Sequence, residues 1–361
     1  MAGALARRCH LLAVVSAQAE NLGAWRRSAG ELFEVPTFSS ARQAALSLVD
    51  LKRHRDLARR IRAYSPDAIY YPMGHLFTPI VNSLLPGIPK VTTIHDPVLH
   101  LGEKNPLVNL LQRLEIRQSE RVIVLSRHCA TLLAGLGVPA SKIDVVPHGE
   151  LSLYRGGAPE PGGAGDGNTL LFFGRIARYK GVDVLLEAFR QVLEHRPASR
   201  LLLVGQGDLG PYERSIAALP NLRVVNRWIP EDEVHGFFAR ADVVVLPYVD
   251  GSQSGVVAIA SACGLPSVAT DVGGVRDQVV DGQTGLVVPR GDAHALAVAC
   301  LELLESPRLR EALGRAAREK AEREWSWDEA AARVLESLRV AATSVRPSGR
   351  RGRAIGEGAP R

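Results

Sequence analysis

The sequence predicts an α/β fold of two Rossmann-like, doubly wound domains in tandem, which face a cleft between them. The chain has 361 residues, more than the roughly 250–300 at which a single core stops growing. Short apolar runs alternate with helical patterns along it, which is typical of parallel sheets built from βαβ units. A Gly/Pro-rich segment at 156–167, GGAPEPGGAGDG, lies between two such periodic halves and predicts a linker.

The first half contains five short apolar runs that predict strands. They lie at residues 10–15, 68–71, 90–94, 121–125 and 144–146. Helices are predicted at 41–64, 106–119 and 128–136. The run at 10–15 belongs to the opening LARRCHLLAVVSA, which we interpret as a buried first strand; the alternative is a signal peptide. No run reaches the roughly 18 apolar residues that a transmembrane helix needs, so any membrane contact is expected to be peripheral.

The second half repeats the alternation of strands and helices. Strands are predicted at 169–173, 200–204, 222–225, 243–246, 267–269 and 285–288. Helices are predicted at 181–195, 212–218, 231–239, 255–262, 293–305, 308–325 and 326–341. The predicted organisation is a first domain at 1–155, the linker at 156–167, a second domain at 168–325, a final helix at 326–342 and a disordered basic tail at 343–361. Doubly wound sheets bind ligands beyond the carboxyl ends of their strands, so we expect the site in the cleft.

The net charge of +6 does not indicate a nucleic-acid-binding protein. Five arginines against Glu357 give residues 346–361 a charge of +4, which leaves the body near +2. We interpret this tail as a solvated segment, or as a tether to anionic lipid or polymer that would give peripheral membrane contact. The four cysteines lie far apart and form no C-x-x-C pair, so we interpret them as buried thiols in a reducing, cytoplasmic compartment and infer no metal site from them. They are Cys9, Cys129, Cys263 and Cys300.

The run LLFFGRIARYKGVDVLLEAF at 170–189 places two fixed cations at a strand-to-helix turn. Gly174 and Arg175 follow the apolar strand, and Lys180 and Gly181 precede the helix. Both cations can point at one anion, where the helix N-terminus adds N–H groups and arginine offers a bidentate fork to phosphate oxygens. The run therefore predicts a diphosphate site; the alternative is an ordinary solvated basic turn.

Three further loops are expected to reach the same edge of the sheet. Gly205 and Gly207 follow a strand and suit close approach of a ligand, although a lone G-x-G is as often a tight connection. The small polar loop at 252–255 precedes a helix of small residues, which predicts either a second anion cradle or a plain N-cap. The pair Gly273 and Gly274 ends another strand.

The first domain places a histidine at a strand end. In TIHDP, His95 and Asp96 face the expected cleft, where a histidine can hydrogen-bond a hydroxyl or move a proton; the alternative is a local cap. Ser126 and the pair His148 and Gly149 also lie at strand ends. For these residues, helix capping and a domain hinge are the preferred interpretations.

These segments resemble glycosyltransferase family 4. The resemblance rests on FFGRIARYKGVDVLLEAF, LLLVGQGDL, ARADVVVLPY and ACGLPSVATDVGGVRDQVVDGQTGLVV in the second domain, and more thinly on TIHDP, RVIVLS and KIDVVPHG in the first. It implies the GT-B fold and retaining transfer of a sugar from a nucleotide donor, without a metal or other cofactor. The first domain would then lie on the acceptor side, and the second would bind the nucleotide sugar. The absence of any D-x-D pair agrees with metal-free transfer.

The resemblance also implies roles for single residues. Arg175 and Lys180 would hold the donor diphosphate and stabilise the leaving nucleotide. His95 would contact the transferred sugar, Trp228 would lie near the nucleobase, and Trp327 would lie in a final helix that crosses back to the first domain. The other donor-binding positions implied are Gly174, Gly205, Gly207, Gln253, Ser254, Gly255 and Val256.

The chain departs from the family at two glutamates that usually precede A-C-G-x-P, where it has Gly251 and Ile259. The expected glycine-rich acceptor loop is also represented only by SAQAENLG at 16–23. The QSG sequence at 253–255 resembles a branch of the family, so a sugar transferase is still predicted. The alternatives are a catalytically inactive nucleotide-sugar-binding or scaffold protein and a nucleotide-sugar epimerase. The acceptor stays open among lipid-linked sugars, polysaccharides, peptides and small molecules.

Overall fold

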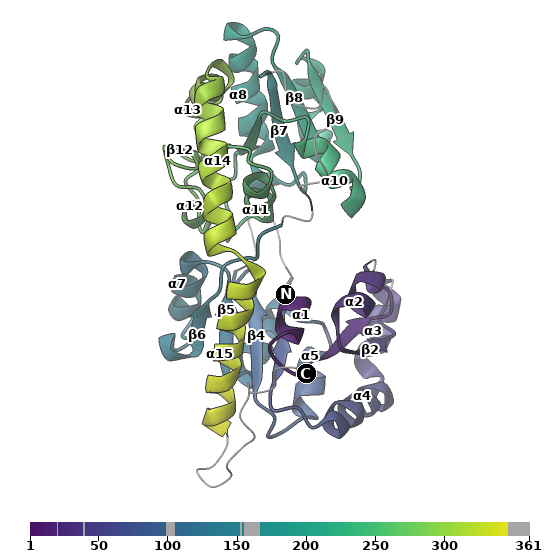
Figure 1. The fold of residues 1–361 in the computed structure, drawn as a ribbon. Coiled ribbons are helices and arrows are strands. Elements are labelled where there is room, and N and C mark those ends of the chain that lie inside the picture. The colour runs from purple at the N-terminus through teal and green to yellow at the C-terminus, as the bar shows by residue number, and fades with distance from the viewer. Residues whose placement is uncertain (20, 39, 99–104, 152–153, 155–166, 346–361) are drawn as a thin grey trace.

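The computed structural model describes residues 1–19, 21–38, 40–98, 105–151, 154 and 167–345, and it has two lobes built on parallel strands (Figure 1). Residues up to 151 form the lower lobe in Figure 1, and the upper lobe begins at residue 167. Two long helices run along one side of both lobes (Figure 1). The predicted linker at 156–167 lies outside the described residues except for Gly167, and so does the tail from residue 346 onward.

A six-stranded parallel sheet forms the core of the upper lobe. Its strands are β7 (Thr169–Phe173), β8 (Arg200–Gly205), β9 (Leu222–Asn226), β10 (Val243–Leu246), β11 (Ser267–Thr270) and β12 (Gly285–Val288). They lie in the order β12-β11-β10-β7-β8-β9, so the direction of winding reverses between β7 and β10. Ligands bind beyond the carboxyl ends of the strands at such a reversal, which is where the loop carrying Arg175 begins.

Helices flank this sheet. They are α8 (Val182–His195), α9 (Glu213–Ala217), α10 (Glu231–Phe238), α11 (Gly255–Ala262), α12 (Val275–Gln278) and α13 (Ala293–Glu305). Leu171 and Phe172 of β7 are fully buried, as expected for a strand that is covered on both faces. Leu185 and Phe189 lie on one face of α8 and join the same core cluster, so the apolar stripe of the sequence is the buried face of the helix.

The lower lobe contains two parallel sheets. The strands β1 (Leu12–Ser16) and β2 (Glu31–Val35) pair with each other, and β3 (Ile69–Tyr71), β4 (Lys90–Ile94), β5 (Arg121–Val124) and β6 (Ile143–Val145) form a second sheet in that order. The helices are α1 (Ala2–Ala6), α2 (Leu22–Ser28), α3 (Ala41–Val49), α4 (Leu51–Tyr64), α5 (Thr78–Ser83), α6 (Pro106–Gln118) and α7 (Arg127–Gly135).

Two predictions for this lobe are wrong. The first strand is not buried: only Ala13 of β1 is enclosed, and Val14 is 41% exposed, because β1 lies in the separate two-stranded sheet. The helix predicted at 41–64 is two helices. The backbone leaves the helical region at Asp50, whose side chain accepts a hydrogen bond from Arg53 N at 3.1 Å and so caps α4.

The cysteines are free thiols, and two of them are less buried than predicted. Cys129 and Cys300 lie in the core, whereas Cys9 and Cys263 are half-buried. Burial raises the pKa of both core thiols, which disfavours their reactive thiolate form. A cytoplasmic location stays a prediction.

The final helix crosses from the upper to the lower lobe. After α14 (Pro307–Glu324), α15 (Trp327–Val345) packs on α1 and on the strands β4 and β5 (Figure 1). A Cβ atom at Gly149 would lie 2.5 Å from the Trp327 ring, so the glycine admits the indole. Ser337 Oγ donates to Asp144 Oδ2 at 2.7 Å. The helix runs to Val345, so residues 343–345, which were predicted to belong to the disordered tail, are helical.

Glu115 of α6 is a buried carboxyl group in the lower lobe. Its Oε1 accepts a hydrogen bond from Thr92 Oγ1, and its carboxylate packs so closely on Gly74 that a Cβ atom there would lie 2.2 Å from Oε2. Burial raises the pKa of Glu115, and the Thr92 hydrogen bond lowers it in part. The folded protein therefore holds this proton more tightly than the unfolded chain does.

Stability should fall with rising pH because of this carboxyl group. Above the ordinary glutamate pKa, the unfolded chain releases the proton before the folded protein does, so the free energy of unfolding decreases until the raised folded pKa is passed. We expect Glu115→Gln to remove this decrease. Urea unfolding of both proteins from pH 4 to pH 8 tests it: the stability of the variant relative to wild type should rise with pH. A difference that is constant across this range contradicts the prediction.

Candidate functional site

The turn between β7 and α8 carries Arg175 and Lys180 and packs directly on the end of β10. Gly181 has φ +66°, and a Cβ atom there would lie 1.9 Å from Pro247 O. Tyr179 O accepts hydrogen bonds from the backbone N–H groups of Val249 at 2.9 Å and Asp250 at 3.3 Å. The two loops that flank the reversal of the sheet are therefore joined through their backbones.

Tyr179 and Tyr248 hold the two cations. Arg175 Nη2 donates to Tyr179 Oη at 2.7 Å. Lys180 Nζ lies 3.6 Å from the centre of the Tyr248 ring and 5.1 Å from that of Tyr179, within the range of cation–π attraction. Both tyrosines are buried, at 4% and 1% exposure, so their rings are fixed. The structure thus brings the two predicted cations together.

Neither tyrosine is among the residues predicted from the sequence. Tyr179 lies between the cations, in ARYKG, and Tyr248 ends the apolar run VVVLPY at the carboxyl edge of the sheet. An aromatic residue at that edge, beside two cations, is the signal that could have identified them.

The start of α11 faces the same region through Ser254. Ser254 is the N-cap residue, yet its side chain makes no capping hydrogen bond; its Oγ instead lies 3.1 Å from Tyr248 Oη. The plain-cap interpretation is therefore wrong for this residue. The Ser254 side chain therefore does not satisfy the first N–H groups of the helix, which include those of Gly255 and Val256 and carry the positive end of the helix dipole.

Gln278 of α12 forms two hydrogen bonds with the backbone of Ser254. Its Oε1 accepts from Ser254 N at 2.7 Å, and its Nε2 donates to Ser254 O at 3.0 Å. This pair of bonds fixes the peptide units immediately before α11. Gln278 is absent from the sequence-based prediction, because nothing in VRDQVV indicates which backbone its side chain contacts.

Gly205 and Gly207 pack on the loop that carries Arg175. A Cβ atom at Gly205 would lie 1.8 Å from Gly174 O, and one at Gly207 would lie 2.0 Å from Ile176 O. Ile176 N also donates to Gln206 O at 2.9 Å, which extends the pairing of β7 and β8 into their loops. These contacts favour the tight-connection interpretation of the two glycines. Contact of Gly174, Gly205 or Gly207 with a ligand stays a prediction.

Gly251 and Ile259 stand where the family usually has glutamates. The backbone of Gly251 packs on a neighbouring loop, and Ile259 lies in the core. Gly251 O would lie 1.7 Å from a Cβ atom at Gly273, so the paired glycines of the β11 loop fit against this segment. Ile259 is 7% exposed and belongs to the apolar core of the upper lobe. Between them, Gln253 Oε1 is buried without a hydrogen-bond partner among the described residues. Gln253 Oε1 is therefore able to accept a hydrogen bond from a ligand.

His95 at the end of β4 is half-buried, and its ring is held by the neighbouring loop. Its Nε2 lies 2.9 Å from Pro72 O. Because a carbonyl oxygen only accepts, Nε2 carries the proton, which leaves Nδ1 of the neutral ring as an acceptor. The thiol of Cys129 lies 3.9 Å from His95 O and 3.7 Å from Ser252 O. His95 is thus close to the loop that precedes α11.

The two lobes meet beside this site. Ser126 caps α7 by accepting from Cys129 N at 3.1 Å, as predicted, and it also donates to Ser252 O at 3.0 Å. Arg127 N donates to Asp277 Oδ2 at 3.0 Å. His148 lies beneath the crossing helix, with its ring centre 6.2 Å from that of Trp327. Burial lowers the pKa of His148, and its backbone hydrogen bond to Gly149 opposes the shift.

Trp228 follows β9 and is 64% exposed. Its neighbour Arg227 pairs with Glu233 of α10. The indole is accessible to a stacking ligand, and its predicted place beside a nucleobase stays a prediction.

Among the residues that the structure describes, no group of three or more His, Cys, Asp or Glu side chains is placed to hold a metal ion. In the same part of the chain, every helix is too short or too polar to cross a bilayer.

Sequence comparisons agree with the resemblance in both lobes. Residues 1–149 match the family model described as Glycosyltransferase Family 4, and residues 167–306 match the one described as Glycosyl transferases group 1. The chain is 32% identical over 237 residues to the GDP-mannose-dependent alpha-(1-6)-phosphatidylinositol monomannoside mannosyltransferase of Mycolicibacterium smegmatis, covering 60% of this chain and 61% of that protein. It is 33% identical over 280 residues to the D-inositol 3-phosphate glycosyltransferase of Pseudarthrobacter chlorophenolicus, covering 71% and 66%. The matches thus span somewhat less than two thirds of these relatives.

Solved structures share the two-lobed fold. Anabaena HepE, crystallised with UDP and glucose, superposes with a TM-score of 0.72 at 17% identity, covering 93% of this chain and 94% of that one. Sucrose-phosphate synthase of Thermosynechococcus elongatus superposes with a TM-score of 0.68 at 20% identity, covering 95% and 98%. The architecture is the GT-B fold predicted from the sequence.

Proposed function

Because the chain belongs to glycosyltransferase family 4, we propose that it transfers a sugar from a nucleotide-diphosphate donor to a hydroxyl group of an acceptor. The observation that carries the proposal is the convergence of Arg175, Lys180 and the start of α11 at the reversal of the upper sheet. Two fixed cations and a helix start without a side-chain cap suit a diphosphate.

The site would act by stabilising the leaving group. When the bond between the anomeric carbon and the diphosphate oxygen breaks, the electron pair stays on that oxygen and the negative charge on the diphosphate increases. Arg175 can bind two phosphate oxygens, Lys180 supplies a second positive charge, and the α11 N–H groups donate to a third position. Since buried rings hold both cations, little reorganisation is needed as the charge develops.

We propose that the transfer retains the anomeric configuration and needs no metal. In a retaining displacement without a protein nucleophile, the acceptor hydroxyl bonds to the anomeric carbon from the face that the diphosphate leaves. The departing oxygen can then take up the hydroxyl proton. Arg175 and Lys180 provide the charge that a metal ion would otherwise supply. His95 Nδ1 would accept a hydrogen bond from the sugar, and Trp228 would stack on the nucleobase.

The names of the relatives support an inositol-containing acceptor. One acts on phosphatidylinositol monomannoside and another on D-inositol 3-phosphate. We propose a phosphate-bearing polyol of this kind, lipid-linked or free, as the acceptor class.

A panel of UDP-, GDP- and ADP-sugars, each with free and lipid-linked inositol phosphates, tests the proposed function. We expect turnover with one donor class, a product of the same anomeric configuration by NMR, and a rate that 5 mM EDTA leaves unchanged. Inhibition by EDTA that Mg²⁺ reverses would refute metal-free transfer. Donor binding without turnover would favour the inactive-scaffold alternative, and an isomerised sugar formed without acceptor would favour the epimerase.

Gln278 should control donor affinity through the backbone of Ser254. Gln278→Ala removes both hydrogen bonds that fix the start of α11, so we expect the KM for the donor to rise roughly 5–30-fold, equivalent to about 1–2 kcal/mol. Steady-state kinetics with varied donor measure this change. Gln283→Ala, which changes an exposed glutamine in the turn between α12 and β12, is the matched control. Equal KM values for the two variants would contradict the prediction.

A further inference from the structure

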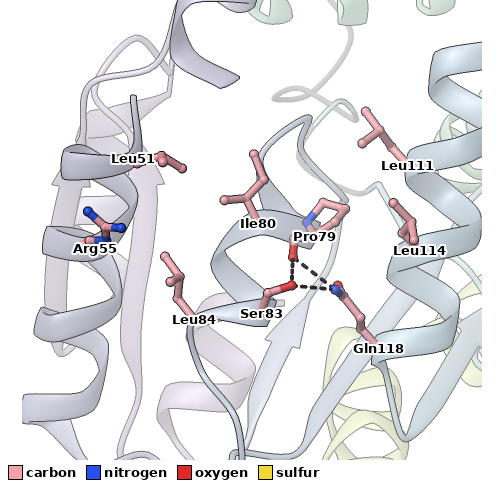
Figure 2. Close-up of a pocket in the computed structure, with 9 residues that line it drawn as sticks. All are labelled: Leu51, Arg55, Pro79, Ile80, Ser83, Leu84, Leu111, Leu114 and Gln118. Atoms are coloured by element: carbon pink, nitrogen blue, oxygen red, sulfur yellow. Dashed lines mark hydrogen bonds between the residues drawn. The ribbon is translucent and has the colours of Figure 1, made fainter. Parts of the chain in front are cut away.

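An apolar groove lies in the lower lobe between three helices. It has a volume of about 390 Å³. Figure 2 shows Leu51 of α4 on one side and Leu111 and Leu114 of α6 on the other. Ile80 of α5 and Leu84, which follows α5, lie between them. Hydrogen bonds from Gln118 Nε2 to Ser83 Oγ and Pro79 O, at 3.0 and 3.1 Å, tie α5 to α6 at one end of the groove (Figure 2). The remaining walls are mostly hydrocarbon.

Exposed apolar side chains continue from the groove onto the surface. Five of the fourteen large apolar side chains that are exposed among the described residues lie on α4 and α6, the helices that flank the groove. They are Leu51, Leu107, Val108, Leu110 and Leu114. A globular helix normally keeps such residues on its core-facing stripe. A patch of this kind marks an interaction surface.

The same surface is strongly basic. Together, α4 and α6 contain eight Lys and Arg residues and two acidic ones. Of the acidic side chains, Glu115 is buried and Asp56 is paired with Arg59 at 3.3 Å. Arg55 itself lines the groove, beside the exposed leucines (Figure 2). The two helices therefore carry a formal charge of +6.

We propose that this α4–α6 surface, formed by α4 and α6 on either side of the groove, binds the surface of an anionic lipid membrane. The leucines would enter the boundary between headgroups and acyl chains, and the long basic side chains would reach the lipid phosphates. The positive charge of the surface favours an anionic membrane over an amphipathic partner helix, because such a helix needs the apolar groove but not the surrounding arginines. The inference goes beyond the proposed transfer reaction and does not depend on it.

The surface is joined to the candidate site through α6. Gln112 Nε2 of α6 donates to Asp96 O at 2.8 Å, one residue after His95. A membrane bound along α6 would therefore lie on the His95 side of the molecule. This geometry suits an acceptor whose headgroup protrudes from the bilayer.

Sedimentation of the full chain with vesicles tests the proposal. Vesicles of phosphatidylglycerol and phosphatidylcholine should bind the protein, and phosphatidylcholine alone should bind it at least tenfold more weakly. Leu107→Asp with Leu110→Asp should lower binding to anionic vesicles by about tenfold or more. Lys52→Glu with Arg55→Glu should do the same, because each basic residue near an anionic surface contributes about 1 kcal/mol, or roughly fivefold.

Variants with the same types of substitution outside the α4–α6 surface serve as controls. Val298→Asp replaces an equally exposed apolar residue on α13, and Arg214→Glu with Arg315→Glu reverses two exposed charges in the upper lobe; both should bind like wild type. Full binding by the leucine variant or the α4 charge variant would overturn the proposal. So would loss of binding only when Arg350, Arg351 and Arg353 are changed to Gln, or leucine-dependent self-association without vesicle binding. Because no donor or acceptor is present, a negative result leaves the transfer reaction untouched.

Discussion

Arg175→Ala combined with Lys180→Ala is expected to lower kcat/KM for the donor by about 10²–10⁴-fold. Each cation contributes a charge-assisted hydrogen bond worth about 1.5–3 kcal/mol, and two of them give roughly 3–6 kcal/mol of lost transition-state stabilisation. The loss should appear in kcat as well as KM, since the diphosphate gains charge as the bond breaks. Initial rates over a range of donor concentrations separate the two parameters.

Arg178→Ala is the matched control for the double variant. Arg178 lies between the two cations on the same turn and is exposed. We expect it to retain activity within about threefold, because no described residue holds its side chain over the site by a hydrogen bond or ion pair. If Arg178→Ala is as damaging as the double variant, the general positive charge of the turn carries the effect. If the double variant keeps its activity, the leaving-group assignment is wrong.

Gly181→Ala is expected to destabilise the fold by about 3 kcal/mol or more and to abolish donor binding. Gly181 has φ +66°, which costs an L-residue roughly 1–2 kcal/mol, and the added methyl group would lie 1.9 Å from Pro247 O. Relief of that clash requires the turn to move away from β10, which separates Lys180 from Tyr248. Urea unfolding and calorimetry with the donor measure the two effects.

Gly291→Ala is the control for Gly181→Ala, because it imposes the same backbone conformation on alanine without a steric clash. Gly291 has φ +74°, and an added Cβ atom there meets nothing within 4 Å. We expect it to cost only about 1 kcal/mol, from the backbone conformation alone, with donor binding intact. Similar losses of stability in the two variants would mean that the turn shifts without penalty and that its packing on β10 does not position the cations.

The sequence predicts best those strands whose runs of apolar or β-branched residues are bounded by glycine or proline. The structure confirms β4, β7, β10 and β12, with the bounds expected from the sequence. The wrong or missing elements lack that signal. The strand β2 (ELFEV) has a glutamate at its start and another inside it, and α12 is only four residues long. The break at Asp50 depends on a capping side chain inside a continuous helical pattern.

In the candidate site too, residues marked by a local sequence pattern can be predicted, whereas residues that act through tertiary contacts cannot. Arg175 and Lys180 are predictable because each stands beside a glycine at the end of an element. Tyr248 and Gln278 act through partners 68 and 24 residues away in the chain, and a single sequence does not specify such contacts. Tyr248 joins the cation turn to Ser254, and Gln278 then fixes Ser254. This chain of contacts forms part of the site although the family's glutamate positions hold Gly251 and Ile259.

A crystal structure of the protein with its intact nucleotide-sugar donor is the decisive test of how the site binds the diphosphate. We predict that the diphosphate contacts Arg175 and Lys180 and accepts hydrogen bonds from the N–H groups of Gly255 and Val256. We also expect the sugar to lie between this point and His95. A diphosphate bound away from both cations, with the start of α11 unoccupied, would contradict these predictions.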